Sequence, residues 1–189
     1  MRNLFVFNMV TLNGYFEGPN KEIDWHNVDE EFNEYAIGML NSVDTLLFGR
    51  VTFELMARYW PTPDAMKDDP IVAEKMNALS KIVFSKTLDE VAWHNTKLVK
   101  DNIEEETRNM KKQPGKDMVL LGSGSILSEF AQRGLIDEYR IMVNPVVLGN
   151  GKPLFKGIKD RLNLKLTKTR IFKSGNVLLY YRPERGGAT

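Results

Sequence analysis

Short apolar runs alternate with stretches of helical spacing along the first two-thirds of the chain. The first run, LFVFNMV at residues 4–10, is rich in β-forming side chains and favours a buried strand. After a turn-rich loop at residues 11–20, apolar residues recur at helical spacing from Asp29, the expected N-cap, through Leu40. The same alternation predicts further strands at residues 44–50, 81–88 and 117–125, and helices at residues 51–60, 69–79, 102–113 and 126–134. Because strands that alternate with helices form mainly parallel sheets, the sequence predicts an α/β domain.

The last third of the chain has strand patterns without helices between them. These strands are expected at residues 137–149, 162–172 and 176–183. The tetrapeptide KSGN at residues 173–176 predicts a hairpin turn between the last two. We therefore expect a parallel sheet with an antiparallel edge, in one domain at residues 1–184 that is followed by a flexible polar tail at residues 185–189.

Length and composition exclude several classes of protein. The chain has 189 residues, of which 42% are hydrophobic, enough for one buried core. Its net charge of +1 does not support a nucleic-acid or membrane partner, and no apolar run reaches the ~18 residues of a membrane span. There is no cysteine, which rules out a disulfide and a thiolate metal site, and two histidines do not suggest a metal centre. Since no signal-peptide pattern is visible, we expect a cytoplasmic protein without a metal.

Three of the expected strands end in small, hydroxylic or basic residues. The first of these ends reads Gly-Arg-Val-Thr at residues 49–52, the second Ser-Lys-Thr at residues 85–87, and the third Gly-Ser-Gly-Ser at residues 122–125. In open α/β sheets, ligands bind at the carboxyl ends of strands, and glycine lets the backbone come close to a phosphate. Arg50 and Lys86 add positive charge that suits phosphate oxygens. Together the three ends favour a site for a diphosphate.

Each of these ends, taken alone, also fits an ordinary structural role. The serines of residues 122–125 are typical of a capped helix N-terminus, and their glycines of a turn. An arginine after a strand is usually a solvated side chain, and Ser-Lys-Thr is a common turn composition. No G-x-G-x-x-G follows the first strand, and Leu127 stands where a third glycine would follow Gly122 and Gly124. The usual dinucleotide fingerprint is therefore missing.

Nearly the whole chain resembles the dihydrofolate reductase superfamily. It is most similar to the reductase domain at the C-terminus of bifunctional riboflavin-biosynthesis proteins, the RibD C-terminal domain family, and to its stand-alone relatives. The matching segments run in family order and include VTLNGYFEGPN, DTLLFGRVTFE, KIVFSKTL and NVLLYYR. The most specific is GLIDEYRIMVNPVVLGNGKPLF at residues 134–155. The resemblance implies a three-layer α/β/α sandwich of dihydrofolate reductase type that binds NADPH across its strand ends.

The resemblance also implies roles for particular residues. Contacts with the cofactor phosphates are implied for Gly49, Arg50 and Thr52, contacts near the adenosine 2′-phosphate for Ser85 and Lys86, and contacts with the pyrophosphate for Gly122, Ser123, Gly124, Ser125 and Ile126. Related proteins are often homodimers through the C-terminal strands, so a homodimer is expected here.

The chain departs from the family pattern at several points. The first loop, usually Leu-Asp-Gly in the riboflavin branch, reads Leu12-Asn13-Gly14, so a side chain that would face a polar substrate is neutral. Ser123 separates two glycines that are often adjacent in relatives. The zinc motif of the riboflavin deaminase half is missing, so this chain would carry out at most the reduction step.

A reductase needs a proton donor and walls for a flat substrate. Asp24 and Glu31 are the candidate donors, although acids before a helix usually compensate its dipole, and bound water is an equal alternative. Asn13, Gly14 and Trp25 are the candidate substrate-binding residues.

Three functions remain open from the sequence. The first is NADPH-dependent reduction of a small heterocyclic or carbonyl substrate, with 5-amino-6-(5-phosphoribosylamino)uracil as the family's best-known case. The second is dihydrofolate or pterin reduction. The third is a non-catalytic NADPH-binding module, because phosphate contacts without a clear proton donor would look the same.

Overall fold

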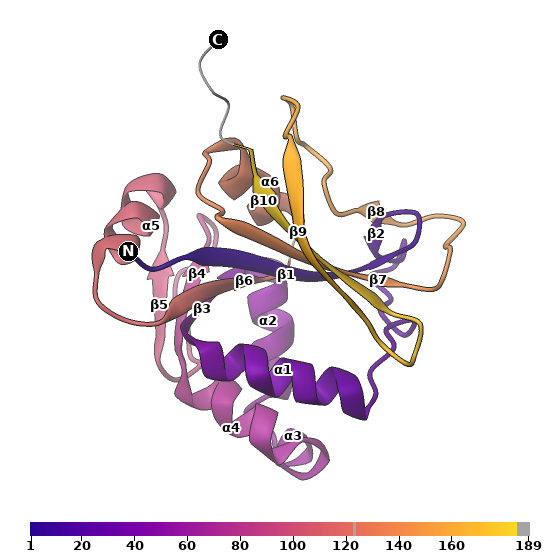
Figure 1. The fold of residues 1–189 in the computed structure, drawn as a ribbon. Coiled ribbons are helices and arrows are strands. Elements are labelled where there is room, and N and C mark those ends of the chain that lie inside the picture. The colour runs from indigo at the N-terminus through magenta and orange to yellow at the C-terminus, as the bar shows by residue number, and fades with distance from the viewer. Residues whose placement is uncertain (123, 185–189) are drawn as a thin grey trace.

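The computed structural model describes residues 1–122 and 124–184. It has an α/β fold in which helices cover both faces of a central sheet (Figure 1), as the sequence predicts. The strands are β1 Leu4–Thr11, β2 Tyr15–Glu17, β3 Val43–Gly49, β4 Ser80–Phe84, β5 Thr96–Val99, β6 Asp117–Leu121, β7 Glu138–Asn144, β8 Lys152–Pro153, β9 Leu164–Ile171 and β10 Val177–Pro183. The helices are α1 Glu30–Ser42, α2 Arg50–Tyr59, α3 Pro63–Asp68, α4 Pro70–Ala78, α5 Ile103–Lys112 and α6 Gly124–Gln132.

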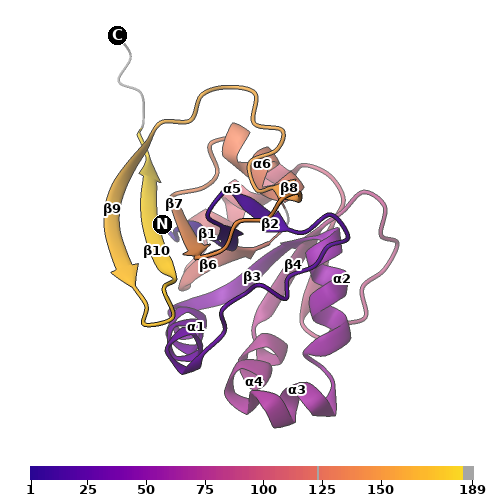
Figure 2. The same ribbon diagram turned by 90° about the vertical axis from the view of Figure 1, so that its right-hand side faces the viewer.

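The main sheet has eight strands in the order β5-β4-β3-β6-β1-β7-β10-β9. The first six strands of this order pair in parallel, whereas β10 is antiparallel to both β7 and β9. Figure 2 shows the β9–β10 hairpin along one edge of the sheet. The predicted mostly parallel sheet with an antiparallel C-terminal edge is therefore confirmed.

Two apolar clusters hold the three layers together. Leu4, Val6 and Val10 of β1 pack under α5 and α6, whereas Phe5 and Phe7 pack under α1, α2 and α4. The alternation follows from the period of two in a strand, and both sets are buried because helices cover both faces. In Figure 2, α5 and α6 lie on one side of the sheet and the other helices on the opposite side.

Local signals fix two helix ends as expected. Asp29 is the N-cap of α1, and its carboxylate accepts a hydrogen bond from the Phe32 backbone N–H at 2.8 Å. After α6, Gly134 adopts a φ of +61°, and the N–H groups of Gly134 and Leu135 donate to Ala131 and Phe130 carbonyls at 3.1 and 3.0 Å. This pattern is a Schellman motif with Gly134 as the C′ residue, the position where glycine is most favoured at a helix end.

Several elements differ from the sequence-based expectation. The loop expected at residues 11–20 contains β2, which pairs with β8 more than a hundred residues later in the chain. Neither α3 nor β5 was expected. The strands expected to reach residues 88 and 125 end at Phe84 and Leu121, and α6 already begins at Gly124. The strands β2 and β5 were missed because pairing between separate segments is invisible in local periodicity. The short helix α3 does carry local signals, the N-cap Thr62 and Pro63.

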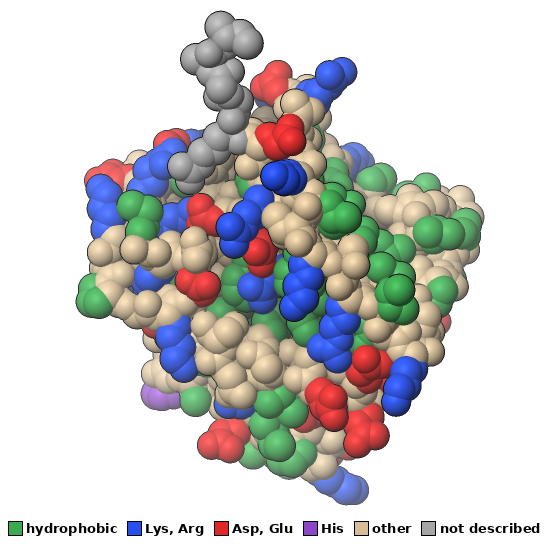
Figure 3. Space-filling model, viewed as in Figure 1, with side chains coloured by type: hydrophobic (Ala, Val, Ile, Leu, Met, Phe, Trp, Pro, Cys, Tyr) green, Lys and Arg blue, Asp and Glu red, His purple; other side chains and the backbone are tan. Residues whose placement is uncertain are grey.

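The edge strand β9 shows where a pattern predicts the element but not its burial. Its alternating leucines predict a half-buried strand, but most of β9 is exposed, with Leu166 at 48% and Ile171 at 75% exposure. Basic side chains on β9 (Lys165, Lys168 and Arg170) accompany this exposure, and Figure 3 shows Lys and Arg side chains along the hairpin. Charged residues on an open edge discourage indiscriminate strand pairing. The homodimer expected through this edge stays a prediction.

Candidate functional site

The three strand ends singled out in the sequence lie side by side in the sheet. β3 is hydrogen-bonded to β4 on one side and to β6 on the other, all in parallel. Gly49 at the end of β3 is in register with Phe84, the residue before Ser85, and Leu47 is in register with Leu120. The three turns that follow these strands therefore share the carboxyl edge of the sheet.

Gly122 and Thr52 bring two of these turns into direct contact. Gly122 has a φ of +70°, in the left-handed region that glycine adopts without strain. A Cβ placed on Gly122 would lie 2.7 Å from Thr52 Oγ1 and 2.8 Å from Thr52 Cγ2, closer than real side-chain contacts. The backbone at Gly122 is thus bare because the first turn of α2 occupies the space that a side chain would need.

The helices α2 and α6 begin at this contact, and neither has a carboxylate in its first turn to offset the positive end of the helix dipole. Their first turns contain no acidic residue, whereas α1 begins with two glutamates and α5 with three. The N-cap of α2 is Gly49, which has no side chain to satisfy the first backbone N–H groups. Two such helix ends at one place suit an anionic group.

The residues predicted to contact the pyrophosphate differ in how far they are buried. Ser123 lies outside the described residues. Gly124 is buried, Ser125 lies exposed in the first turn of α6, and Ile126 packs its side chain in the core beneath that helix. A contact of Ile126 with a ligand would therefore come from its backbone.

A second layer of chain closes over the start of α6. A Cβ on Gly124 would lie 2.7 Å from the Leu154 carbonyl oxygen and 3.1 Å from Phe16 Cε1. Phe16 belongs to β2, and the Leu154 backbone N–H donates to the Gly14 carbonyl at 3.1 Å. The small sheet of β2 and β8 is in this way seated against the glycine turn.

Asn13 holds two loops together with its side chain. Its Nδ2 donates to the Leu148 carbonyl at 2.8 Å, while its Oδ1 accepts from Thr11 Oγ1 at 2.8 Å. An aspartate has no N–H to donate to Leu148, which gives a physical reason for asparagine at this position. Gly14 beside it adopts a φ of +86° in the turn. The structure thus places the predicted substrate residues Asn13 and Gly14 in the loop after β1, with the Asn13 carboxamide bonded to protein.

Three asparagines anchor the loop that carries Trp25. The Asn27 backbone N–H donates to Asn144 Oδ1 at 3.0 Å, and Asn27 Nδ2 donates to Asn176 Oδ1 at 3.2 Å. Asn176 Nδ2 donates back to the Asn27 carbonyl at 3.1 Å, and both Asn144 and Asn176 are fully buried. Because Asn144 ends β7, this network fixes the Trp25 loop at the same carboxyl edge. A single asparagine in a loop gives no sequence signal for such a network, so Asn27 and Asn176 were missed.

Trp25 and His26 form a half-buried aromatic pair in this loop. Their ring centroids lie 4.4 Å apart in an edge-on arrangement, and Trp25 Nε1 donates to the Glu22 carbonyl at 3.2 Å. The buried His26 Nε2 has no hydrogen-bond partner among the described residues. Burial lowers the pKa of His26 from 6.5 to about 4, so the imidazole is neutral at pH 7.

We expect His26 to make the protein sensitive to mild acid. Below pH 6.5 the unfolded chain takes up a proton at His26 that the folded protein excludes, so the free energy of unfolding falls until about pH 4. The loss is about 2 kcal/mol after allowance for partial exposure. Urea unfolding at pH 7.5 and pH 4.5 should show that His26→Gln removes this loss. His94→Gln, at the other and exposed histidine, is the control and should keep it; equal pH dependence of His26→Gln and wild type would contradict the prediction.

The candidate proton donors lie near this loop without forming an acid site. Asp24 is exposed and makes no hydrogen bond with a described residue. Glu31 Oε2 accepts from the Lys173 backbone N–H at 2.8 Å, and its Oε1 lies 3.4 Å from Arg170. Glu31 therefore ties α1 to the turn end of the β9–β10 hairpin.

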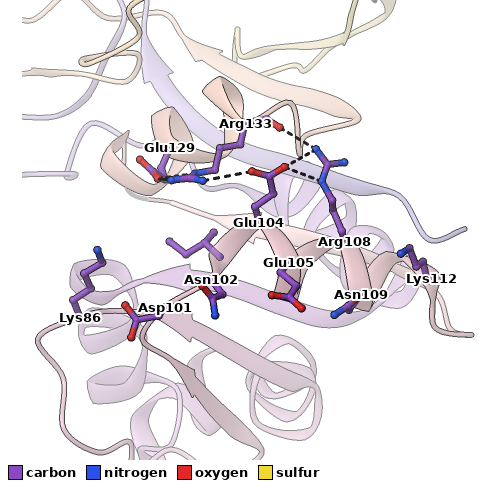
Figure 4. A pocket seen from close by; sticks show the side chains of 11 residues that line it. Lys86, Asp101, Asn102, Glu104, Glu105, Arg108, Asn109, Lys112, Glu129 and Arg133 are labelled. Atoms are coloured by element: carbon purple, nitrogen blue, oxygen red, sulfur yellow. Dashed lines mark hydrogen bonds and ion pairs between the residues drawn. The ribbon is translucent and has the colours of Figure 1, made fainter.

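The turn after β4 leads into a cavity of about 750 Å³ between α5 and α6. Ser85 Oγ accepts from the Thr87 and Leu88 backbone N–H groups at 3.2 and 3.1 Å and so shapes the turn. Lys86 is exposed and lines the cavity beside Asp101 (Figure 4).

The cations of the cavity walls differ in their pairing. Arg108 pairs with Glu104 at 3.0 Å and Arg133 with Glu129 at 2.6 Å. Lys86, by contrast, has no ion pair with any residue in the described ranges. Arg50 at the start of α2 makes an exposed contact of 3.5 Å with Glu54, which contributes little. Arg50 and Lys86 are thus two cations at this edge that are available to an anion.

The described part of the chain offers no alternative metal site or membrane segment. Residues 1–122 and 124–184 contain no group of three or more His, Cys, Asp or Glu side chains placed to hold a metal ion. Within the same ranges, no helix combines the length and apolar character needed to cross a bilayer.

Comparison with known sequences places the chain among relatives of similar length. It is 40% identical over 180 residues to the uncharacterized protein YyaP of Bacillus subtilis, covering 95% of this chain and 94% of that protein. It is 26% identical over 187 residues to the uncharacterized protein YwjB of the same organism, covering 96% and 98%.

Comparison with solved structures shows the same fold at low sequence identity. A putative riboflavin biosynthesis protein from Shewanella matches with a TM-score of 0.75 and 23% identity, over 97% of this chain and 99% of that one. The Thermotoga maritima diaminohydroxyphosphoribosylaminopyrimidine deaminase/5-amino-6-(5-phosphoribosylamino)uracil reductase matches with a TM-score of 0.69 and 15% identity, over 96% of this chain and 56% of that one. The family model of the RibD C-terminal domain matches residues 2–178. The chain therefore belongs to the RibD C-terminal domain family.

Proposed function

We propose that this protein is an NADPH-dependent reductase of a small heterocyclic or carbonyl substrate. The observation that carries the proposal is the contact of Gly122 with Thr52, which brings together, at the carboxyl edge, two helix N-termini whose first turns contain no acidic residue. A backbone without a side chain at Gly122, next to the first turns of two helices, fits a diphosphate. We call the site formed by Gly122 and the first turns of α2 and α6 the cradle. Membership of the RibD C-terminal domain family supports a reductase rather than another protein that binds an anion in this cradle.

The cofactor would extend from the glycine turn toward β4. The first turns of α2 and α6 would hold the diphosphate, with Arg50 beside it as an exposed guanidinium. Because β4 is next to β3, the adenosine end would reach Ser85 and Lys86, where the cavity between α5 and α6 begins. Lys86 would then be the counter-charge of the 2′-phosphate.

The opposite end of the cradle would receive the substrate. The loop after β1, the Trp25–His26 pair and the end of β7 lie on that side, since β6 is followed in the sheet by β1 and β7. When bound, NADPH supplies a hydride from C4 of its nicotinamide ring. The residues around it would orient the acceptor carbon, and Trp25 would offer an aromatic wall.

We propose that water delivers the proton that accompanies the hydride. Glu31 is committed to the hairpin through both oxygens, and Asp24 is exposed in its loop. A solvent-derived proton on the oxygen or nitrogen of the reduced double bond completes the reaction without a dedicated acid.

Two acceptors and a control without acceptor separate the candidate reactions. NADPH oxidation at 340 nm is measured with 5-amino-6-(5-phosphoribosylamino)uracil, with dihydrofolate, and without acceptor. We expect turnover with the phosphoribosylamino pyrimidine or a related heterocycle. Calorimetry with NADPH decides the cofactor: no heat and no shift in melting temperature would overturn the proposal. Tight binding without turnover on any acceptor would instead favour a non-catalytic binding module.

Removing either cation should reveal how the protein distinguishes NADPH from NADH. We expect Arg50→Ala and Lys86→Ala each to raise the Kd for NADPH about 10-fold, because a charge-assisted contact to phosphate is lost. The Kd for NADH should change less than about 3-fold for Lys86→Ala, since NADH has no 2′-phosphate. Lys67→Ala, an exposed lysine of α3, serves as the control. An equal loss for both cofactors would remove Lys86 from the 2′-phosphate role.

A further inference from the structure

Asn8 is a polar residue in a strand that is otherwise apolar from Leu4 to Val10. Its side chain is only 6% exposed, and its Oδ1 has no hydrogen-bond partner among the described residues. A buried carbonyl without a partner costs free energy, because it has given up its bonds to water. Such an atom in a folded protein calls for an explanation.

The position of Asn8 relates it to the glycine turn. Pairing of β1 with β6 ends at Phe7 and Leu121, so Asn8 is level with Gly122, where β6 leaves the sheet. Beyond that level β1 pairs only with β7, through Asn8 to Thr11. From Asn8 onward, β1 therefore has no strand partner on the side of β6. We call this unpaired step in the carboxyl edge of the sheet the notch, and Asn8 is the first β1 residue that borders it.

The direction of the side chain follows from the strand period. Leu4, Val6 and Val10 all lie in the cluster under α5 and α6, so Asn8 faces the same side. Ile126 and Leu127 of α6 belong to that cluster as well. The Asn8 carboxamide thus lies on the α6 side of the sheet, level with the turn that leads into the helix whose N-terminus we assign to the diphosphate.

Within residues 1–122 and 124–184, two further buried side-chain atoms lack a hydrogen-bond partner, and both lie elsewhere. Tyr35 OH belongs to α1 on the opposite face of the sheet, where its ring packs against Phe7 at 5.5 Å. His26 Nε2 lies in the loop before α1. Asn8 is therefore the unpartnered buried group that borders the cradle on the α6 side of the sheet.

We infer that Asn8 positions the nicotinamide end of the cofactor, by accepting a hydrogen bond from the carboxamide N–H of that ring. The inference rests on the proposed function. An apolar residue at position 8 would suit the cluster on this face, which contains Val6, Val10 and Ile126, so asparagine carries a burial cost there. A ligand donor at the notch would satisfy Oδ1 and fix which face of the ring meets the acceptor.

Asn8→Leu separates this role from a structural one. We expect the variant to raise the melting temperature of the free protein by about 2–4 °C, because an unsatisfied buried group is removed. The same change should raise the Kd for NADPH about 10-fold, through loss of the bond to Oδ1. Asn176→Leu is the matched control: this buried asparagine is fully bonded, so its loss should lower the melting temperature.

An analogue of the cofactor identifies the group that Asn8 contacts. The 3-acetylpyridine analogue of NADPH has a methyl ketone in place of the carboxamide and so has no N–H to donate. Wild type and Asn8→Leu should bind this analogue with equal affinity. A 10-fold loss that persists with the analogue would overturn the inference, because Asn8 would then contact another group.

The remaining outcomes distinguish this inference from the proposed function. If wild type does not bind NADPH, the proposed function fails and the inference with it. If wild type and Asn8→Leu bind NADPH equally, the inference alone fails. A lower melting temperature for Asn8→Leu would show that Asn8 serves the fold, and would also overturn it.

Discussion

Gly122→Ala is expected to raise the Kd for NADPH at least about 100-fold and to destabilise the fold. Alanine at a φ of +70° costs about 1–2 kcal/mol. The added methyl would also lie 2.7 Å from Thr52 Oγ1, so α2 or the turn must shift, at a further cost of about 1–3 kcal/mol. Because the first turn of α2 is part of the proposed diphosphate site, the shift reaches the cofactor directly. Calorimetry with NADPH and urea unfolding measure the two effects.

Gly134→Ala separates backbone strain from the close contact. Gly134 has a similar φ of +61°, but a Cβ there meets no atom within 4 Å. This control should lose only about 1 kcal/mol and should bind NADPH like the wild type. Adding Thr52→Ser to Gly122→Ala removes the Cγ2 methyl and should recover part of the stability. If Gly122→Ala and Gly134→Ala behave alike, the contact with Thr52 does not constrain the site.

Lys81→Met is expected to lower the free energy of unfolding by about 3 kcal/mol or more. Lys81 lies in β4 with 1% exposure, and its Nζ donates to the carbonyls of Met76, Asn77 and Leu79 at 3.0, 2.9 and 2.7 Å. These carbonyls end α4, where the helix has no following turn to satisfy them. Methionine fills similar volume but leaves all three buried acceptors unpaired.

The charge of Lys81 strengthens this cap. Its Nζ lies 4.7 Å from the centre of the Trp93 ring, and the end of a helix favours a cation. Burial lowers the pKa of Lys81 to about 8, so the ammonium form still predominates at pH 7. Urea unfolding at pH 7 measures the effect. Lys97→Met, on the neighbouring strand β5, breaks an exposed pair with Glu106 and should lose less than about 1 kcal/mol. Equal losses for the two variants would contradict the predicted cap.

The sequence was sufficient for features that short stretches encode by themselves. Asp29 caps α1 and Gly134 ends α6 because each acts within a few residues of its own helix. The buried strands β1, β3 and β6 follow from continuous apolar runs, since a strand covered on both faces is apolar on both. The strand-end residues of the site could be named for the same reason: small and basic residues stand out directly after such runs.

The site itself could be predicted only in part. That Gly122 carries the closest approach, and that its neighbour is Thr52, depends on how β3 and β6 align in the sheet. Asn8 looked like one polar residue within a strand, and its burial became visible only with α6 above it. Asn13 was expected to face a substrate, but its hydrogen bonds to Leu148 required the loop after β7 to be in place.

The amino-acid sequence by itself determined the α/β class, the parallel sheet with its antiparallel edge, and the family, because periodicity, caps and turn residues act over a few positions. The tertiary structure alone decided the pairing of β2 with β8, the capping of α4 by Lys81, and the anchoring of Asn27 to Asn144 and Asn176. β2 and β8, like Asn27 and its two partners, lie more than a hundred residues apart in the sequence, so their contacts depend on how the elements pack. Lys81 lies only two to five residues from its acceptors, but its burial in β4 depends on the sheet around it.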